Sequence, residues 1–234
     1  IRDCLLSRGL GDVYKRQDSH TLYGALTSSP AADWPKGSMR SIVEWDTNKP
    51  LGEIEQVEHT YAVIGNMNEH QLTVVESTWG GRPELVDTTG IIDYGSLMQL
   101  ALERAKTARE AIKVMTGLVK KYGYYSSGES FTIADPNEAW ILDLIGKGPG
   151  RRGAVWVAVR IPDDCIAGHA NYPRIHKIPM DDKENCLYSP DVISFAREMG
   201  YFDGLNKDFS FARAYSPADF GALRACDARV WSFF

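Results

Sequence analysis

The sequence lacks the cysteine and histidine patterns that mark disulfide-rich or metal-binding proteins. Its four cysteines, Cys4, Cys165, Cys186 and Cys226, include no CxxC pair and no compact spacing. This spacing excludes a small secreted protein held together by disulfides, and it favours free, buried thiols in a reducing compartment. The five histidines form no HExxH motif and no i,i+4 pair. We therefore predict no metal site and no cofactor.

Long apolar runs and an excess of positive charge are also missing. No run approaches the roughly 18 apolar residues that a membrane span needs, and no export signal is visible, so we expect a cytoplasmic protein without a membrane partner. The formal net charge is −5 and the pI is about 5.6. Because phosphate binding needs clustered Lys and Arg, we also predict no nucleic-acid partner. A composition of 44% hydrophobic and 24% charged residues is that of a globular domain.

Consecutive apolar segments between residues 126 and 171 predict the centre of a sheet. Segments 131–134 and 140–145 flank Asp135-Pro136-Asn137-Glu138, a turn sequence, and therefore predict a hairpin. Segment 154–161 is rich in Val and follows a glycine-rich connection, which predicts a third strand. We expect a fourth strand at 165–171. The nearly continuous apolar character predicts that both faces of the sheet are covered.

Other segments predict further strands and several helices. Segments 61–64 and 72–75 flank a polar turn and predict a second hairpin, and 42–45 predicts a short strand. Apolar residues from 97 to 119 repeat with a helical period, and Thr107 with Glu110 forms a capping box that divides the region near Lys106. Ser189-Pro190 and Ser216-Pro217 predict the starts of two more helices. This order predicts an α+β protein with layered αββα packing.

Both ends of the chain differ from the segment between them. Residues 1–17 have no periodicity and no caps, and their end resembles a translated sequencing adapter, so we interpret them as a non-native leader. Residues 18–234 are then a partial domain. The final Trp-Ser-Phe-Phe predicts that the domain is also cut at its C-terminus, because a domain rarely ends on such residues.

A series of short motifs from residue 18 to the end resembles the cysteine dipeptidases of the dipeptidase A type. These belong to the N-terminal nucleophile hydrolases. The motifs are Asp18-Ser-His20, Gly65-Asn-Met-Asn-Glu-His70, Glu76-Ser-Thr-Trp-Gly-Gly-Arg82, Thr107-Ala-Arg-Glu-Ala111, Ser127-Gly-Glu-Ser-Phe131, Ala134-Asp-Pro-Asn-Glu138, Gly146-Lys-Gly-Pro-Gly150, His169-Ala-Asn171 and Ala228-Arg-Val-Trp231. The resemblance implies an incomplete αββα four-layer sandwich and a small-peptide substrate. It also implies that the complete protein can form a homo-oligomer.

The resemblance also implies a mechanism. The nucleophile would be a cysteine at residue one of the mature chain, with its own α-amine as the base. Such an amine has a pKa near 8, so part of it is unprotonated at neutral pH and can accept the thiol proton. Attack on the amide carbon would form an oxyanion and then a thioester.

The resemblance assigns catalytic roles to three residues of this chain. Asp18 matches the acid that orients the amine of the nucleophile, and Asn171 matches an asparagine near the amine and the oxyanion. Thr78 falls where relatives place an oxyanion donor, although they use an asparagine there, so only a backbone N–H or the hydroxyl could act. Turn or cap roles are the alternatives for Asp18 and Asn171.

Four further residues are predicted to bind substrate. Asn68, Glu69 and Glu76 are expected to line a pocket for the charged amine of a dipeptide. Arg224 is our candidate for a late arginine of the superfamily, and Arg229 competes with it because the helical spacing does not decide between them.

The expected nucleophile strand is missing at its usual place, about twenty residues before Asp18. Cys4 lies too close to Asp18 and lacks the expected turn after it, so it is a poor substitute. We therefore expect the chain as it stands to be inactive. A phosphate loop at 146–153 is disfavoured because a strand, not a helix, follows it.

Two other functions stay open at this point. The first is an amide hydrolase of the bile-salt or penicillin acylase type, which an apolar pocket would favour over the charged pocket predicted around Glu76. The second is a peptide-binding module without catalytic activity. The native sequence upstream of Asp18 would separate the second from a hydrolase.

Overall fold

The computed structural model describes residues 28–234 and is built around one eight-stranded antiparallel sheet. The strand order is β1-β6-β7-β8-β9-β10-β11-β12. The long central strands are β8 (Thr73–Gly80), β9 (Gly128–Ala134), β10 (Ala139–Gly146) and β11 (Ala154–Ile161). The short ones are β1 (Ser28–Ser29), β6 (Val63–Ile64), β7 (Met67–Asn68) and β12 (Cys186–Tyr188).

Two small two-stranded sheets precede the central strands. They are β2 (Ala32–Asp33) with β5 (His59–Thr60), and β3 (Met39–Val43) with β4 (Pro50–Glu55). The turn between β3 and β4 contacts the residue before helix α2 (Tyr94–Arg104), where the backbone N–H of Trp45 donates to Asp93 Oδ2 at 2.7 Å.

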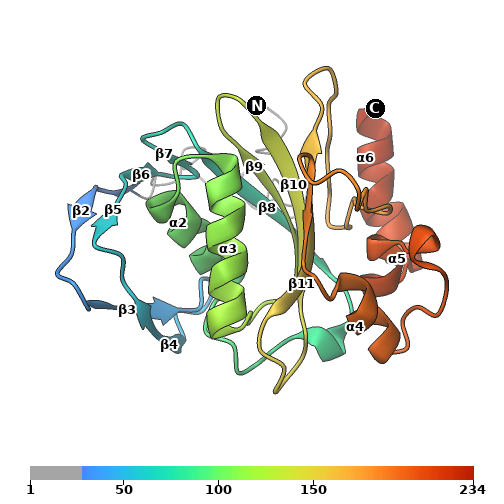
Figure 1. Ribbon diagram of the computed structural model, residues 1–234, viewed down its shortest axis with the longest axis horizontal. Helices are drawn as coiled ribbons and strands as arrows, with labels where there is room; N and C mark the ends of the chain where they lie inside the picture. The colour runs from blue at the N-terminus through green and yellow to red at the C-terminus, as the bar shows by residue number, and fades with distance from the viewer. Residues whose placement is uncertain (1–27) are drawn as a thin grey trace, which may run out of the picture.

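Helices α2 (Tyr94–Arg104) and α3 (Ala108–Tyr122) cover one face of the sheet, as Figure 1 shows. Their apolar residues, such as Leu97 and Met115, pack on the sheet residues Phe131 and Trp140, all nearly or fully buried. The predicted break between the helices is confirmed. Thr107 Oγ1 accepts a hydrogen bond from the N–H of Glu110, which caps α3.

The opposite face is covered by the C-terminal half of the chain (Figure 1). Here lie α4 (Val192–Glu198), α5 (Phe211–Tyr215), η3 (Ala222–Asp227) and α6 (Ala228–Phe233), with the short turns η1 (Pro83–Leu85) and η2 (Asn206–Asp208). Residues of α4 and α5 pack on Trp79, Ile141 and Val157 in a second apolar core. Apolar cores on both faces explain why the central strands are nearly continuous in apolar residues.

The predicted hairpin of β9 and β10 is confirmed, and so is the strand β11, but three other predictions need correction. Segments 61–64 and 72–75 do not form a hairpin with each other, because β7 lies between β6 and β8 and pairs with both. Segment 165–171 is not a strand; the outer strand is β12, twenty residues further on. The last helix begins at Phe220, where Asp219 Oδ1 accepts from Ala222 N at 2.7 Å, and not directly after Pro217. In the described residues a single large sheet lies between helical layers, so the mixed α and β character is confirmed, whereas the second sheet of an αββα sandwich is not seen there.

Candidate functional site at the edge of strand β8

Asn171 lies beside β8, and both its backbone and its side-chain amide form hydrogen bonds. Its backbone is left-handed, with φ +53°, a conformation that asparagine tolerates better than most residues. Its backbone N–H donates to Ser77 Oγ at 3.3 Å, and its side-chain Nδ2 donates to the carbonyl oxygen of Thr78 at 2.5 Å. Its Oδ1 accepts from Arg229 Nη2 at 2.8 Å. The predicted Asn171 is therefore a rigidly held amide.

Two residues before Asn171, His169 anchors the loop to the sheet. Its Nδ1 lies 2.5 Å from Ser77 Oγ and its Nε2 lies 2.8 Å from Thr132 Oγ1. Burial, and then the positive charge of Arg174, lower the pKa of His169 to about 4, so the ring is neutral at pH 7. The motif that carries Asn171 also contains this histidine, but nothing in the sequence indicates its role.

A buried aspartate fixes the other end of the same loop. Asp143 of β10 accepts from Ser130 Oγ at 2.5 Å and from the backbone N–H of Ile175 at 2.8 Å. Burial raises the pKa of Asp143 to about 6 despite these hydrogen bonds. Residues 169–175 are thus attached at both ends to polar side chains that share one face of the sheet.

The side chains of Glu76 and Thr78 lie on the opposite face, beneath α2 and α3. Pairing of β8 with β9 places Glu76 opposite Phe131 of the helix-covered core, and the Thr78 hydroxyl donates to Glu129 Oε1 at 2.7 Å. Burial, and then the nearby Glu76, raise the pKa of Glu129 well above its usual value. Of Thr78, it is the backbone carbonyl that meets Asn171, and the hydroxyl points away from it.

The side of β8 that carries Asn171 has little strand pairing. β7 pairs with β8 only at Thr73, and Val74 exchanges contacts with Asn66 just beyond it, its N–H donating to the Asn66 carbonyl at 3.1 Å. Among the strands that the structure describes, none runs beside β8 from there to Gly80 on this side. Within residues 28–234, β7 is thus the neighbour of β8 on the side that Asn171 contacts, and it pairs with β8 only at Thr73.

The structure does not bring the predicted residues Asn68 and Glu69 to Asn171. The buried Asn68 side chain donates to the carbonyls of Leu102 and Ala105 and accepts from two backbone N–H groups of its own turn. Glu69 Oε1 accepts from the N–H of Ala62 at 3.1 Å. Both side chains thus have a structural use in joining the β6–β8 turns to each other and to α2.

The competition between the two arginines is resolved by their positions on the last helix. Arg229 reaches the Ala170 carbonyl and Asn171 Oδ1, and its Nε is buried without a partner in the described part of the chain. Arg224 is exposed and lies over the Phe220 ring, 5.6 Å from its centroid. Arg229, and not Arg224, is the arginine that faces Asn171.

Asp18 and Cys4 lie outside the described residues, so their predicted roles stay predictions. Of the other cysteines, Cys186 is buried, Cys226 is partly buried and Cys165 is exposed, all as free thiols. The expectation of buried thiols therefore holds for Cys186 and is wrong for Cys165. No group of metal-binding side chains was found in residues 28–234.

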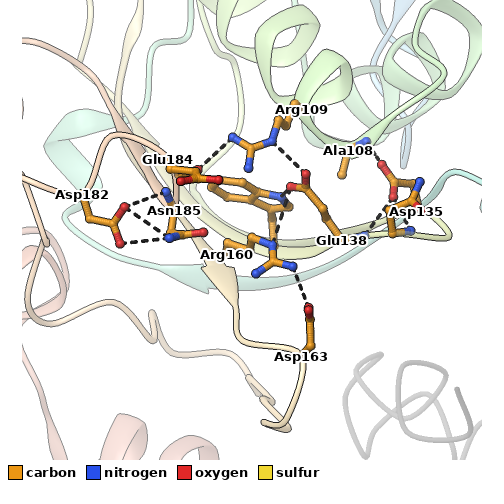
Figure 2. A network of polar contacts seen from close by, with 11 residues as sticks. Ala108, Arg109, Asp135, Glu138, Arg160, Asp163, Asp182, Glu184 and Asn185 are labelled. Atoms are coloured by element: carbon orange, nitrogen blue, oxygen red, sulfur yellow. Dashed lines mark hydrogen bonds and ion pairs between the residues drawn. The ribbon is translucent and has the colours of Figure 1, made fainter.

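The Asp-Pro-Asn-Glu motif has a structural role, shown in Figure 2. Asp135 Oδ1 accepts from the N–H groups of Asn137 and Glu138 and closes the β9–β10 turn, while its Oδ2 accepts from Ala108 N at 2.8 Å at the start of α3. Glu138 accepts from Arg109 Nε at 2.9 Å and from Trp140 Nε1 at 2.7 Å. The network ties α3 to the turn between β9 and β10.

The fold and site define a mixed α/β protein with an asparagine–arginine pair on the edge of a sheet. The model of the family described as Peptidase family C69 matches residues 12–234, and the chain belongs to this family. No helix in residues 28–234 is both long enough and apolar enough to span a membrane.

Three relatives carry dipeptidase names. The chain is similar to a "Probable dipeptidase" of Salmonella dublin, with 30% identity over 208 residues, which covers 85% of this chain and 44% of that protein. It is 35% identical over 100 residues to a "Probable dipeptidase" of Latilactobacillus sakei, covering 43% and 20%. It is 28% identical over 122 residues to a "Probable dipeptidase B" of Streptococcus pyogenes serotype M1, covering 52% and 23%. The chain thus spans less than half the length of each of these relatives.

Proposed function

We propose that the chain is part of a cysteine-type dipeptidase in which Asn171 and Arg229 form the oxyanion side of the active site. The observation that carries the proposal is the amide of Asn171, which is held at the edge of β8 between the Thr78 carbonyl and Arg229. Membership of Peptidase family C69 and the dipeptidase names of three relatives support the same reaction class. The substrate is a small peptide.

In this geometry Asn171 and Arg229 have separate roles in the proposed reaction. An amide nitrogen carries two N–H groups, and Thr78 occupies one of them, so the other N–H of Asn171 is available to an oxyanion. Its Oδ1 can accept from an α-amine as well as from Arg229, because a carbonyl oxygen has two lone pairs. The Arg229 charge stabilises both a thiolate and the developing oxyanion.

In this proposal the cysteine is the first residue of a strand that pairs with the edge of β8. That strand places its thiol and its own α-amine next to Asn171, and Asp18 orients the amine. The α-amine takes the thiol proton as the sulfur attacks the carbonyl carbon of the peptide bond; the C–N bond then breaks and the leaving amine departs with that proton. Water hydrolyses the resulting thioester, which releases the acid product and restores the thiol.

A direct test compares this chain with a version that begins with the native upstream sequence. We expect the 234-residue chain to release no amino acids from dipeptides, and Cys4→Ala to change nothing. The extended protein should hydrolyse dipeptides only when its N-terminal residue is a free cysteine, as N-terminal sequencing would verify. Activity of the 234-residue chain that Cys4→Ala abolishes would contradict the proposal, and so would an upstream sequence without a cysteine.

One observation favours the amide hydrolase of the acyl type as a second candidate. The carboxylates expected to bind a peptide amine do not gather at Asn171: Glu76 lies on the other face of the sheet, and Glu69 caps a backbone N–H. Assaying the extended protein on dipeptides, on N-acylated dipeptides and on acyl amides separates the two. A preference for substrates with a free amine supports the dipeptidase, whereas a preference for acyl amides supports the alternative.

A further inference from the structure

A hollow of about 400 Å³ lies between residues 176–177 and 207–213. None of the predicted site residues lines it. Its volume falls within the range of pockets for small organic molecules, about 300–1,000 Å³. The two walls are joined by backbone hydrogen bonds of 3.0 Å from Phe211 N to the His176 carbonyl and from Ala212 N to the Ile175 carbonyl. The hollow is therefore held by the fold and does not depend on one flexible side chain.

The side chains around the hollow are mostly cationic. Lys177, Lys207 and Arg213 line it, with His176 beside them and Asp208 as the one acid. This contrasts with the net charge of −5 for the whole chain. The three cations are exposed, and none of them forms an ion pair within the described part of the chain. Their positive charge is thus directed into a common space without a protein counter-charge other than Asp208.

His176 adds a polar ring to the lining of the hollow. Burial lowers its pKa most, the charges of Arg174 and Arg213 lower it further, and the charge of Asp227 acts in the opposite direction. Its Nδ1 lies 3.1 Å from Ser210 Oγ, so the ring is also positioned by a hydrogen bond. The neutral ring and the Ser210 hydroxyl provide polar contacts between the cations.

We propose that this hollow binds a small organic anion with two carboxylates, of the kind that an acidic peptide carries. Separated lysines and an arginine suit two carboxylates better than one compact charge, because their ammonium and guanidinium groups stand on different walls. The buried Phe209 ring supplies an apolar surface for the chain between the carboxylates. The inference does not depend on the proposed function, because binding needs no turnover.

The test is calorimetric titration of the full 234-residue chain at low salt with the dipeptide Glu-Glu. The neutral dipeptide Gln-Gln and inorganic phosphate serve as matched probes. We expect Glu-Glu to bind, Gln-Gln to show no heat of binding, and added salt to weaken the Glu-Glu signal through screening. No binding of Glu-Glu, or equal binding of Gln-Gln, would overturn the proposal. Phosphate binding as tight as that of Glu-Glu would overturn the assignment to carboxylates.

Charge reversals locate the binding site. Lys207→Glu and Arg213→Glu should each weaken Glu-Glu binding about tenfold, since each removes an attraction and adds a repulsion. Lys183→Glu, an equal charge change at an exposed lysine outside the hollow, should leave the affinity unchanged. All three positions are exposed, so the variants should keep the circular dichroism spectrum of the parent. An equal loss in Lys183→Glu would show a general charge effect and refute the site.

Discussion

The two faces of strands β8 and β9 use their buried polar groups in different ways. On the helix-covered face, Glu129 holds a carboxyl group under α2 and α3, with Oε2 lacking a partner among the described residues. On the other face, Ser77 and Thr132 hold His169, and through it the loop that carries Asn171. Side chains adjacent in sequence, such as Ser77 and Thr78, thus serve opposite faces. Consecutive residues of one motif therefore serve two regions: the Ser77 side chain belongs to the candidate site, and the Thr78 side chain belongs to the buried core beneath the helices.

The largest expected difference between the faces concerns Asn171. In the complete protein, Asn171→Gly should lower kcat about 10²–10³-fold, the usual cost of losing an oxyanion donor. Glycine accepts the left-handed backbone, so this variant removes the side chain without adding strain. The measurement is the steady-state rate on a dipeptide. The control is Asn137→Ala in the exposed β9–β10 turn, and unchanged turnover in Asn171→Gly would remove Asn171 from the mechanism.

A second effect on the same face concerns stability. Asp143→Ala should lower the free energy of unfolding by about 3 kcal/mol, because it leaves the Ser130 hydroxyl and the Ile175 N–H buried without their acceptor. Asp143→Asn keeps an acceptor oxygen and should lose less. Urea unfolding of both variants measures the difference. Equal losses in the two variants would show that the hydrogen bonds to Asp143 contribute little.

The sequence predicted those parts of the fold that depend on local pattern. The strands around Asp135-Pro136 and the helix break before Thr107 are marked by apolar periodicity, turn residues and a capping box, and all of these act over a few residues. The loop at 165–171 was mistaken for a strand because its position is fixed by Ser77 and Thr132, which lie 92 and 37 residues away from His169. No periodicity reports such distant polar contacts.

The candidate site could be predicted only in part for the same reason. Asn171 was found through its motif, but the choice between Arg224 and Arg229 needed the orientation of the last helix. Side chains alternate between the two faces of a strand, so Glu76 and Thr78 are expected on one face of β8 and Ser77 on the other. The sequence does not say which of these faces contacts the loop that carries Asn171. Asn68 is a second example. It lies in a turn, but its side chain donates to the carbonyls at the end of α2, which lie more than thirty residues further along the chain.

The faces should also differ in how pH affects stability. His169 has a folded pKa of about 4 against an ordinary value of 6.5, so the unfolded chain takes up a proton that the folded chain refuses. Its contribution is therefore present above pH 6.5 and is lost as the pH falls toward 4. His169→Gln should lower the free energy of unfolding by about 1–2 kcal/mol at pH 7 and flatten this acid slope. Urea unfolding between pH 4 and 7, with the exposed His59→Gln as control, tests this. An unchanged slope would mean that His169 does not titrate as described.

Glu129, on the helix-covered face, should give the smallest effect and the opposite sign. Its folded pKa lies above the ordinary 4.5, so the folded chain keeps a proton that the unfolded chain releases, and stability falls as the pH rises above 4.5. Glutamine has nearly the shape of a protonated glutamate, so Glu129→Gln should change the free energy of unfolding by less than about 1 kcal/mol near pH 4. At higher pH it should stabilise the protein relative to the parent, because the unfavourable release of the proton is removed. If Glu129→Gln instead destabilises the protein increasingly as the pH rises, the carboxyl is ionised in the folded state, and the contrast between the two faces disappears.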